Sequence, residues 1–210
     1  MKELEQRAFN FEIRAEQSDE LGNIITGRPI VYNSKTNMGC YDEIIAQGAL
    51  ANTDLTDVRF LVNHDISKIP LARSRRNNGN STMLLSTDND GMYIRVTLDT
   101  ENNSEARALY SAVQRGDISG MSFMFSINEE EWTDLESEHP TRTITDIGTV
   151  VEVSAVTFPA YDSTEIEARS KAALESARSA LDNARRQRAQ SVETDELAIL
   201  KAKNEILSKL

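Results

Sequence analysis

The strongest constraint on the fold is a change in residue composition near Thr164. Residues 1–164 contain all nine glycines, all four prolines, all six phenylalanines and all five tyrosines of this 210-residue chain. Residues 165–210 contain none of these and are rich in Ala, Leu, Glu, Lys and Arg, which favour helices. We therefore expect a strand-rich globular domain at 1–164 and a helical tail at 165–210.

Strand-like patterns dominate the first part. The expected strands lie at 9–14, 24–32, 58–62, 83–87, 92–98, 118–127 and 143–158. The segment 88–91 (DNDG) predicts a hairpin turn, because Asn, Asp and Gly tolerate positive φ. Short helices are expected at 41–51 and 104–115. Many strands with few helices indicate a mainly β (α+β) fold, and we expect a small closed or nearly closed β-barrel with flanking helices.

The tail has the 3.6-residue periodicity of helices. Leu174, Ala177, Leu181 and Ala184 follow one another in steps of three or four. Residues 191–194 (SVET) suggest a break, after which Thr194 could cap a second helix. Two short helices with thin apolar stripes are marginal in water. We therefore expect the tail to be mobile, to pair with other helices, or to become ordered on docking.

Charge and composition exclude several classes of function. The net charge of −11 argues against a nucleic-acid binder, which needs clustered Lys and Arg, and against docking on an anionic membrane. No run of about 20 apolar residues is present, and residues 1–14 lack the apolar centre of a signal peptide. One cysteine and two histidines do not make a usual structural zinc site. We expect a cytoplasmic protein without a metal or other cofactor.

The two histidines occupy different contexts. His139 lies in a polar stretch directly before Pro140, and the residue before proline is held extended, so we expect an exposed loop residue. His64 ends a predicted strand and leads into a loop, which suits a catalytic histidine as well as an ordinary surface one. Cys40 could be a nucleophile, but it lies in a predicted turn.

A serine and a carboxylate could complete a hydrolytic site with His64. Ser122 should point away from the apolar face of its strand, whereas the rival Ser119 falls in a turn-like segment. Glu152 interrupts an apolar run and could orient the imidazole. Asp65 competes for that role, but adjacent side chains in extended chain point apart, which favours Glu152. There is no Gly-x-Ser-x-Gly elbow, which disfavours an α/β-hydrolase.

Six short motifs in a fixed order give the chain a family resemblance. They lie at 27–33 (GRPIVYN), 43–50 (EIIAQGAL), 63–65 (NHD), 70–73 (PLAR), 116–123 (GDISGMSF) and 152–161 (EVSAVTFPAY). Together they resemble the prohead proteases of tailed phages, which are related in fold to the herpesvirus assemblins. The resemblance extends over residues 7–169 and leaves the tail uncovered.

The resemblance implies a role for each candidate residue. It implies a compact β-barrel with the site on its outer surface, His64 as general base, Ser122 as nucleophile and Glu152 as the third member. The implied substrates and partners are the major capsid protein and its scaffold segment. Cleavage would occur in the host cytoplasm, inside the assembling prohead, and could include the protease itself.

The tail is expected to interact with scaffold helices, to self-associate or to be removed by self-cleavage. Two other functions stay open: a non-enzymatic assembly or scaffold protein that uses the tail, and a serine hydrolase of small esters.

Overall fold

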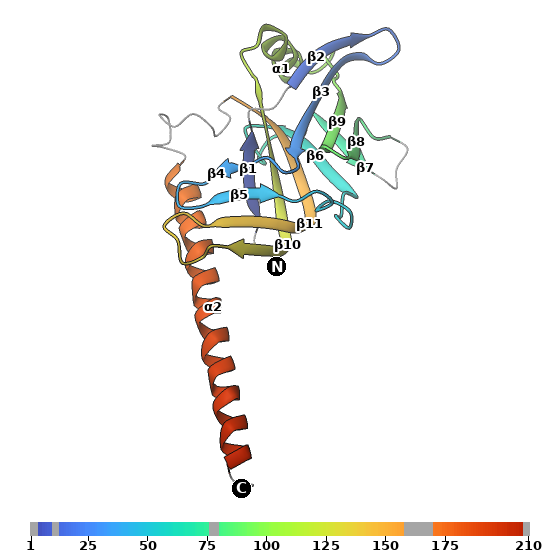
Figure 1. The fold of residues 1–210 in the computed structure, drawn as a ribbon. Coiled ribbons are helices and arrows are strands. Elements are labelled where there is room, and N and C mark those ends of the chain that lie inside the picture. Colours follow the sequence, from blue (N-terminus) through green and yellow to red (C-terminus); the bar gives the residue numbers. More distant parts are fainter. Residues whose placement is uncertain (1–3, 10–12, 76–79, 158–169, 208–210) are drawn as a thin grey trace. The chain divides into compact units, whose positions relative to one another are not determined.

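The computed structural model describes residues 4–9, 13–75, 80–157 and 170–207, which fall into two compact units (Figure 1). The first unit comprises Met1–Lys35, Ile44–Glu131 and Thr143–Ile166. The second comprises Thr36–Glu43, Trp132–Arg142 and Glu167–Leu210. The predicted boundary after residue 164 falls within 158–169, outside the described residues, and stays a prediction.

The larger of two sheets is built around two long strands, β10 and β11. Its path runs β1 (Glu5–Phe9), β10 (Gly120–Thr133), β11 (Thr141–Val156), β5 (Asp42–Ile45) and β4 (Thr36–Asn37). The end of β11 also pairs in parallel with β6 (Asp57–Val62), and β6 pairs with β7 (Ala72–Arg75). In this register Glu152 lies opposite Arg59 and Ala155 opposite Val62. The strand that precedes His64 therefore lies beside the strand that carries Glu152.

The smaller sheet is antiparallel and belongs to the first unit. Its order is β2 (Ile13–Ser18), β3 (Gly22–Val31), β9 (Gly91–Thr97) and β8 (Met83–Asp88) (Figure 1). The predicted turn at 88–91 is confirmed, since it joins β8 to β9. Gly91 has a φ of 140°, and a Cβ added there would lie 2.0 Å from the carbonyl oxygen of Ile30. No other residue fits this close approach without moving the backbone.

Helix α1 (Ser104–Arg115) is confirmed at its predicted position. The Asn103 side chain accepts hydrogen bonds from the backbone N–H groups of Glu105 and Ala106, and Gly116 ends the helix with a φ of 79°. These are the preferred caps for the two ends of a helix. Leu109 and Val113 are buried, and the helix packs against β2 and β3.

One apolar core holds the first unit together. Both sheets and α1 contribute to it; its largest fully buried members include Phe60, Phe123, Phe125, Ile25, Ile30, Met83, Met92, Ile94, Met121, Ile144 and Ile147. Burying each such side chain contributes about 1.5–3 kcal/mol. The prediction of a mainly β fold with helices is confirmed. The predicted closed barrel is not supported, because the strand pairing of the described residues gives two separate sheets.

The second unit has a small core of its own. Ala177 and Leu181 of α2 (Ser170–Leu207) are buried with Tyr41 in this core. The ring of Tyr41 meets that of Trp132 edge-on with centroids 4.9 Å apart. The Arg185 guanidinium donates hydrogen bonds to the carbonyl oxygens of Leu135 and Ser137, at 3.0 and 2.9 Å.

The predicted break in the tail is wrong, because α2 is one continuous helix of 38 residues. Ser191 and Thr194 do not cap a new helix. Their hydroxyls donate to the carbonyl oxygens of Arg188 and Gln190 in the preceding turn, both at 2.8 Å. Such back-bonding satisfies a hydroxyl without interrupting a helix.

The predicted helix at 41–51 is also wrong. Tyr41, Glu43 and Ile45 are buried in alternation with less buried neighbours, which is the two-residue period of a strand. Strand β5 pairs with β4, with Thr36 opposite Glu43. Sheet pairing thus overrides the local helix signal.

Over the part of the chain that the structure describes, no helix is both long and apolar enough to cross a membrane.

Candidate functional site

A sharp turn after β6 positions His64. Asn63 and His64 both have left-handed backbone conformations, with φ of 53° and 59°. Such conformations are uncommon outside glycine and cost about 1–3 kcal/mol each, so surrounding contacts must hold them. The Asn63 N–H donates to the carbonyl of Ala155 at 2.9 Å, and its side chain exchanges hydrogen bonds with Thr157. The turn is therefore fastened to β11.

His64 and Glu152 form a pair in which the carboxylate is buried and the imidazole is partly buried. The imidazole Nδ1 lies 2.5 Å from Oε1 of Glu152. The Glu152 side chain is 1% exposed and that of His64 14%. A buried carboxylate is tolerated where hydrogen bonds satisfy it. Because Nδ1 faces the carboxylate, Nε2 is the ring nitrogen that can act as a base.

Ser154 links the two members of this pair. Its hydroxyl donates to Oε2 of Glu152 at 2.5 Å and accepts from the backbone N–H of His64 at 3.2 Å. Ser154 is fully buried. The sequence reasoning missed it, although a small polar residue two positions after Glu152 must share its strand face. That spacing was the available signal.

Ser122 lies on β10, the neighbour of β11, and has a different partner. Its hydroxyl donates to the backbone carbonyl of Arg7 at 2.7 Å, and the residue is 1% exposed. Strand β1 pairs antiparallel with this stretch of β10 in the same sheet, with Ala8 opposite Ser122. Met121 and Phe123 face the core as expected, but the opposite face is covered too. Of the three predicted site residues, the structure brings His64 and Glu152 into contact. The Ser122 hydroxyl is instead hydrogen-bonded to the backbone carbonyl of Arg7.

The competing residues of the first unit lie in other environments. Asp65 caps its own loop, where its carboxylate accepts from the N–H and the hydroxyl of Ser67 at 3.1 and 2.5 Å. The hydrogen bond from the Ser67 side chain lowers the pKa of this exposed carboxyl. Ser119 is exposed in the segment before β10.

The remaining candidates belong to the second unit. His139 is exposed, and its Nε2 lies 2.9 Å from a carboxylate oxygen of Asp42. Cys40 is half-buried, and this burial raises the pKa of its thiol, which disfavours the thiolate that a nucleophile requires. Among the residues described, no three His, Cys, Asp or Glu side chains group as a metal site.

Comparisons with known proteins place the chain in a family. The sequence profile of the caudovirus prohead serine proteases matches residues 9–178. The chain therefore belongs to the caudovirus prohead serine protease family. The prohead protease of Enterobacteria phage HK97 is 30% identical over 148 residues, which cover 69% of this chain and 59% of that protein. The chain thus spans less than two thirds of the length of this relative.

One solved structure is also similar in part. The capsid assembly protease of bacteriophage T4 aligns over 72% of this chain and 98% of its own, with 14% sequence identity and a TM-score of 0.36.

Proposed function

We propose that this chain is a serine endopeptidase that cleaves capsid or scaffold precursor proteins during prohead maturation. Family membership supports the reaction class. The observation that carries the site is the 2.5 Å contact between His64 and the buried carboxylate of Glu152. A partly buried imidazole that a carboxylate orients, with one nitrogen left for a substrate proton, suits a general base.

In the proposed mechanism, Ser122 is the nucleophile. Nε2 of His64 takes the hydroxyl proton as Oγ attacks a peptide carbonyl carbon. His64 then gives that proton to the leaving amine, and water hydrolyses the acyl-enzyme in the same way. Glu152 stabilises the imidazolium, while Ser154 holds its second carboxylate oxygen.

This mechanism requires a rearrangement at Ser122. Its hydroxyl must leave the Arg7 carbonyl, and the buried side chain must become accessible to a substrate carbonyl. Rotation about the Cα–Cβ bond and displacement of β1 from β10 would achieve both. We propose that the hydrogen bond to Arg7 belongs to a resting state.

Substitution of Ser122 tests the proposal. With the phage's capsid precursor as substrate, Ser122→Ala should abolish cleavage, whereas Ser119→Ala should leave it unchanged. Mass spectrometry of the purified chain adds a second readout, since specific self-cleavage should occur in the wild type alone. Cleavage that survives in Ser122→Ala rules out the assigned nucleophile.

The second candidate is a non-enzymatic assembly protein. The burial of Ser122 and the bond from its hydroxyl to Arg7 favour it, because neither feature exposes a nucleophile. It predicts that His64→Ala leaves capsid maturation unaffected. The protease predicts immature capsids with the same variant.

The tail gives the enzyme a way to reach its substrates. Val192, Leu197, Ile199 and Leu200 of α2 are 44–58% exposed. We propose that this part of the helix pairs with scaffold helices, or with a second copy of the chain, and carries the protease into the prohead inside the host cell. Enclosure there raises the effective concentration of substrate. A chain without residues 165–210 that is packaged normally would contradict this role.

A further inference from the structure

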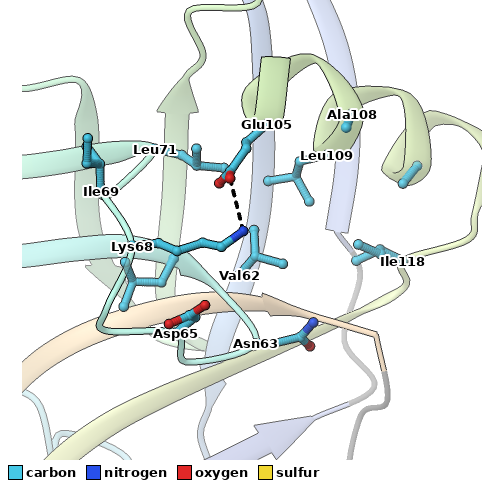
Figure 2. Close-up of a pocket in the computed structure, with 12 residues that line it drawn as sticks. Val62, Asn63, Asp65, Lys68, Ile69, Leu71, Glu105, Ala108, Leu109 and Ile118 are labelled. Carbon is cyan, nitrogen blue, oxygen red and sulfur yellow. Dashed lines mark hydrogen bonds and ion pairs between the residues drawn. The ribbon is translucent and has the colours of Figure 1, made fainter. Parts of the chain in front are cut away.

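A groove lies beside the proposed catalytic turn, within the first unit (Figure 2). Its volume is about 370 Å³, at the lower end of the range for ligand sites. It is bounded by the end of β6, the loop after it, α1 and Ile118. Asn63 and Asp65, the neighbours of His64, line it. Ile118 precedes the strand that carries Ser122, so the groove lies between the segments bearing the proposed base and nucleophile.

The walls of the groove are mainly aliphatic. They are formed by Leu61, Val62, Ile69, Leu71, Leu109 and Ile118. Ala108 and Ala112, one turn apart on α1, also line it. The structure leaves Ala108 exposed and Ala112 half-buried. Their short side chains leave room for an occupant.

A single ion pair bridges the lining of the groove. Nζ of Lys68 lies 2.9 Å from Oε1 of Glu105, and Figure 2 shows this contact spanning from the loop to α1. Both side chains are about half exposed. With Asp65, the polar lining carries two carboxylates and one ammonium group. An acidic side chain would therefore be repelled, and the aliphatic walls would disfavour any unpaired charge.

The loop that follows His64 also presents apolar side chains to solvent. Ile66 is 78% exposed and Ile69 84%. Exposed aliphatic side chains beside a groove are typical of a surface that binds a polypeptide. An extended peptide across this loop would direct alternate side chains into the groove.

We propose that this groove is a specificity subsite that takes one aliphatic side chain, such as Leu, Ile, Met or Val, of the polypeptide substrate within a few residues of the bond cleaved. The inference rests on the proposed endopeptidase function. The inference adds the class of substrate to that function. The polypeptide segments cleaved should carry an aliphatic residue, and not an acidic one, at one fixed position relative to the cleaved bond.

Two substitutions change the groove in opposite directions. Ala112→Phe fills it from α1, and Ile118→Ala widens it. Gln114→Phe is the matched control for the first, because Gln114 is an exposed residue of the same helix that does not line the groove. None of these residues belongs to the proposed triad. Circular dichroism and thermal unfolding identify variants that fold.

Each protein is incubated with a peptide library made by digesting a bacterial proteome, and the cleaved bonds are identified by mass spectrometry. The wild type and Gln114→Phe should show the same aliphatic preference at one position. Ala112→Phe should lower kcat/KM for aliphatic residues about tenfold or more and shift the preference to Gly and Ala. Ile118→Ala should shift it toward Phe and Tyr.

The failures are distinguishable. Wild-type cleavage without an aliphatic preference, or an unchanged preference in both folded groove variants, overturns the subsite and leaves the protease intact. If Ala112→Phe does not fold, Ile118→Ala decides in the same way. A wild type that cleaves neither the library nor the capsid precursor, and whose Ser122 does not react with a fluorophosphonate, overturns both proposals.

Discussion

Two glutamates of this chain are equally buried but have different partners. Glu152 is 1% exposed and Glu43 2%. Glu43 pairs with Arg142 at 3.2 Å, and that guanidinium stacks over the Trp132 ring with its carbon 5.8 Å from the ring centroid. Glu152 pairs with His64. An arginine keeps its charge at every relevant pH, whereas histidine gains and loses a proton near neutrality.

The comparison teaches that the partner decides what a buried carboxylate can do. The Glu43–Arg142 pair fixes charge and hydrogen bonds in place, so we expect its loss to alter stability. The Glu152–His64 pair can hold and release a proton, so we expect its loss to alter activity. The two pairs thus provide controls for each other.

The largest expected effect is on activity, from Glu152→Gln. The amide keeps the shape of the side chain but cannot stabilise the imidazolium. We expect kcat for precursor cleavage to fall roughly 10³–10⁴-fold, by analogy with other triads. Single-turnover assays measure the change. A fall below tenfold in a folded variant would contradict the role of Glu152.

The next effect is on stability, from Arg142→Met. This change leaves the Glu43 carboxylate buried without its guanidinium, which should lower the free energy of unfolding of the second unit by about 3–5 kcal/mol. Urea denaturation followed through Trp132 fluorescence measures it.

A double variant controls for this stability change. Arg142→Met combined with Glu43→Leu removes both charges and should recover most of the loss. Equal destabilisation in the single and double variants would show that lost packing, and not the charge that remains on Glu43, causes it.

Ser154→Ala tests the positioning of Glu152. The change removes one hydrogen bond to a charged group, which is worth about 1.5–3 kcal/mol. We expect kcat to fall about 10–100-fold with KM unchanged, because Ser154 is fully buried and acts through its hydrogen bonds with Glu152 and His64. A matching rise in KM would instead indicate a distorted binding surface. Ser126→Ala, at another buried serine of the first unit, is the control.

The smallest effect belongs to an exposed ion pair, Arg28–Asp88. The hydrogen bond from the Arg28 guanidinium holds the pKa of Asp88 well below its usual value. Stability from a lowered carboxyl pKa is present above the unfolded pKa of about 3.9 and is lost as pH falls through the folded value.

Asp88→Asn should therefore remove a stabilisation of less than about 1 kcal/mol at neutral pH, because both side chains are partly exposed. The difference from the wild type should shrink below pH 4. Thermal unfolding between pH 2 and pH 7 measures it. A difference that stays constant across this range would show that the charge of Asp88 is not its cause.

Local features of the fold were predictable from the sequence. The hairpin at 88–91 and helix α1 follow from turn and cap residues that act over a few positions. The structure of segment 41–51 and the separation of the two sheets could not be predicted, because both depend on strands brought together from distant parts of the chain. The continuity of α2 could not be predicted, because the hydroxyl groups of Ser191 and Thr194 can either cap a new helix or bond to the preceding turn of the same helix.

The candidate site divides in the same way. The proximity of His64 and Glu152 agrees with the sequence-based choice of Glu152 over Asp65, although their roles stay a prediction. The partner of Ser122 could not have been predicted, since Arg7 is 115 residues away in sequence. The spacing of Ser154 from Glu152 is visible in the sequence, but its hydrogen bond with His64 and the left-handed turn at Asn63 depend on β6 and β11 lying side by side.

The central claim is that the His64–Glu152 pair activates Ser122, and the reaction with a fluorophosphonate tests it most directly. Peptide mapping by mass spectrometry should find one adduct, on Ser122, whose rate of formation falls at least 100-fold in His64→Ala and in Glu152→Gln. An adduct on Ser119, or on Ser122 at the same rate in all three proteins, would contradict the claim.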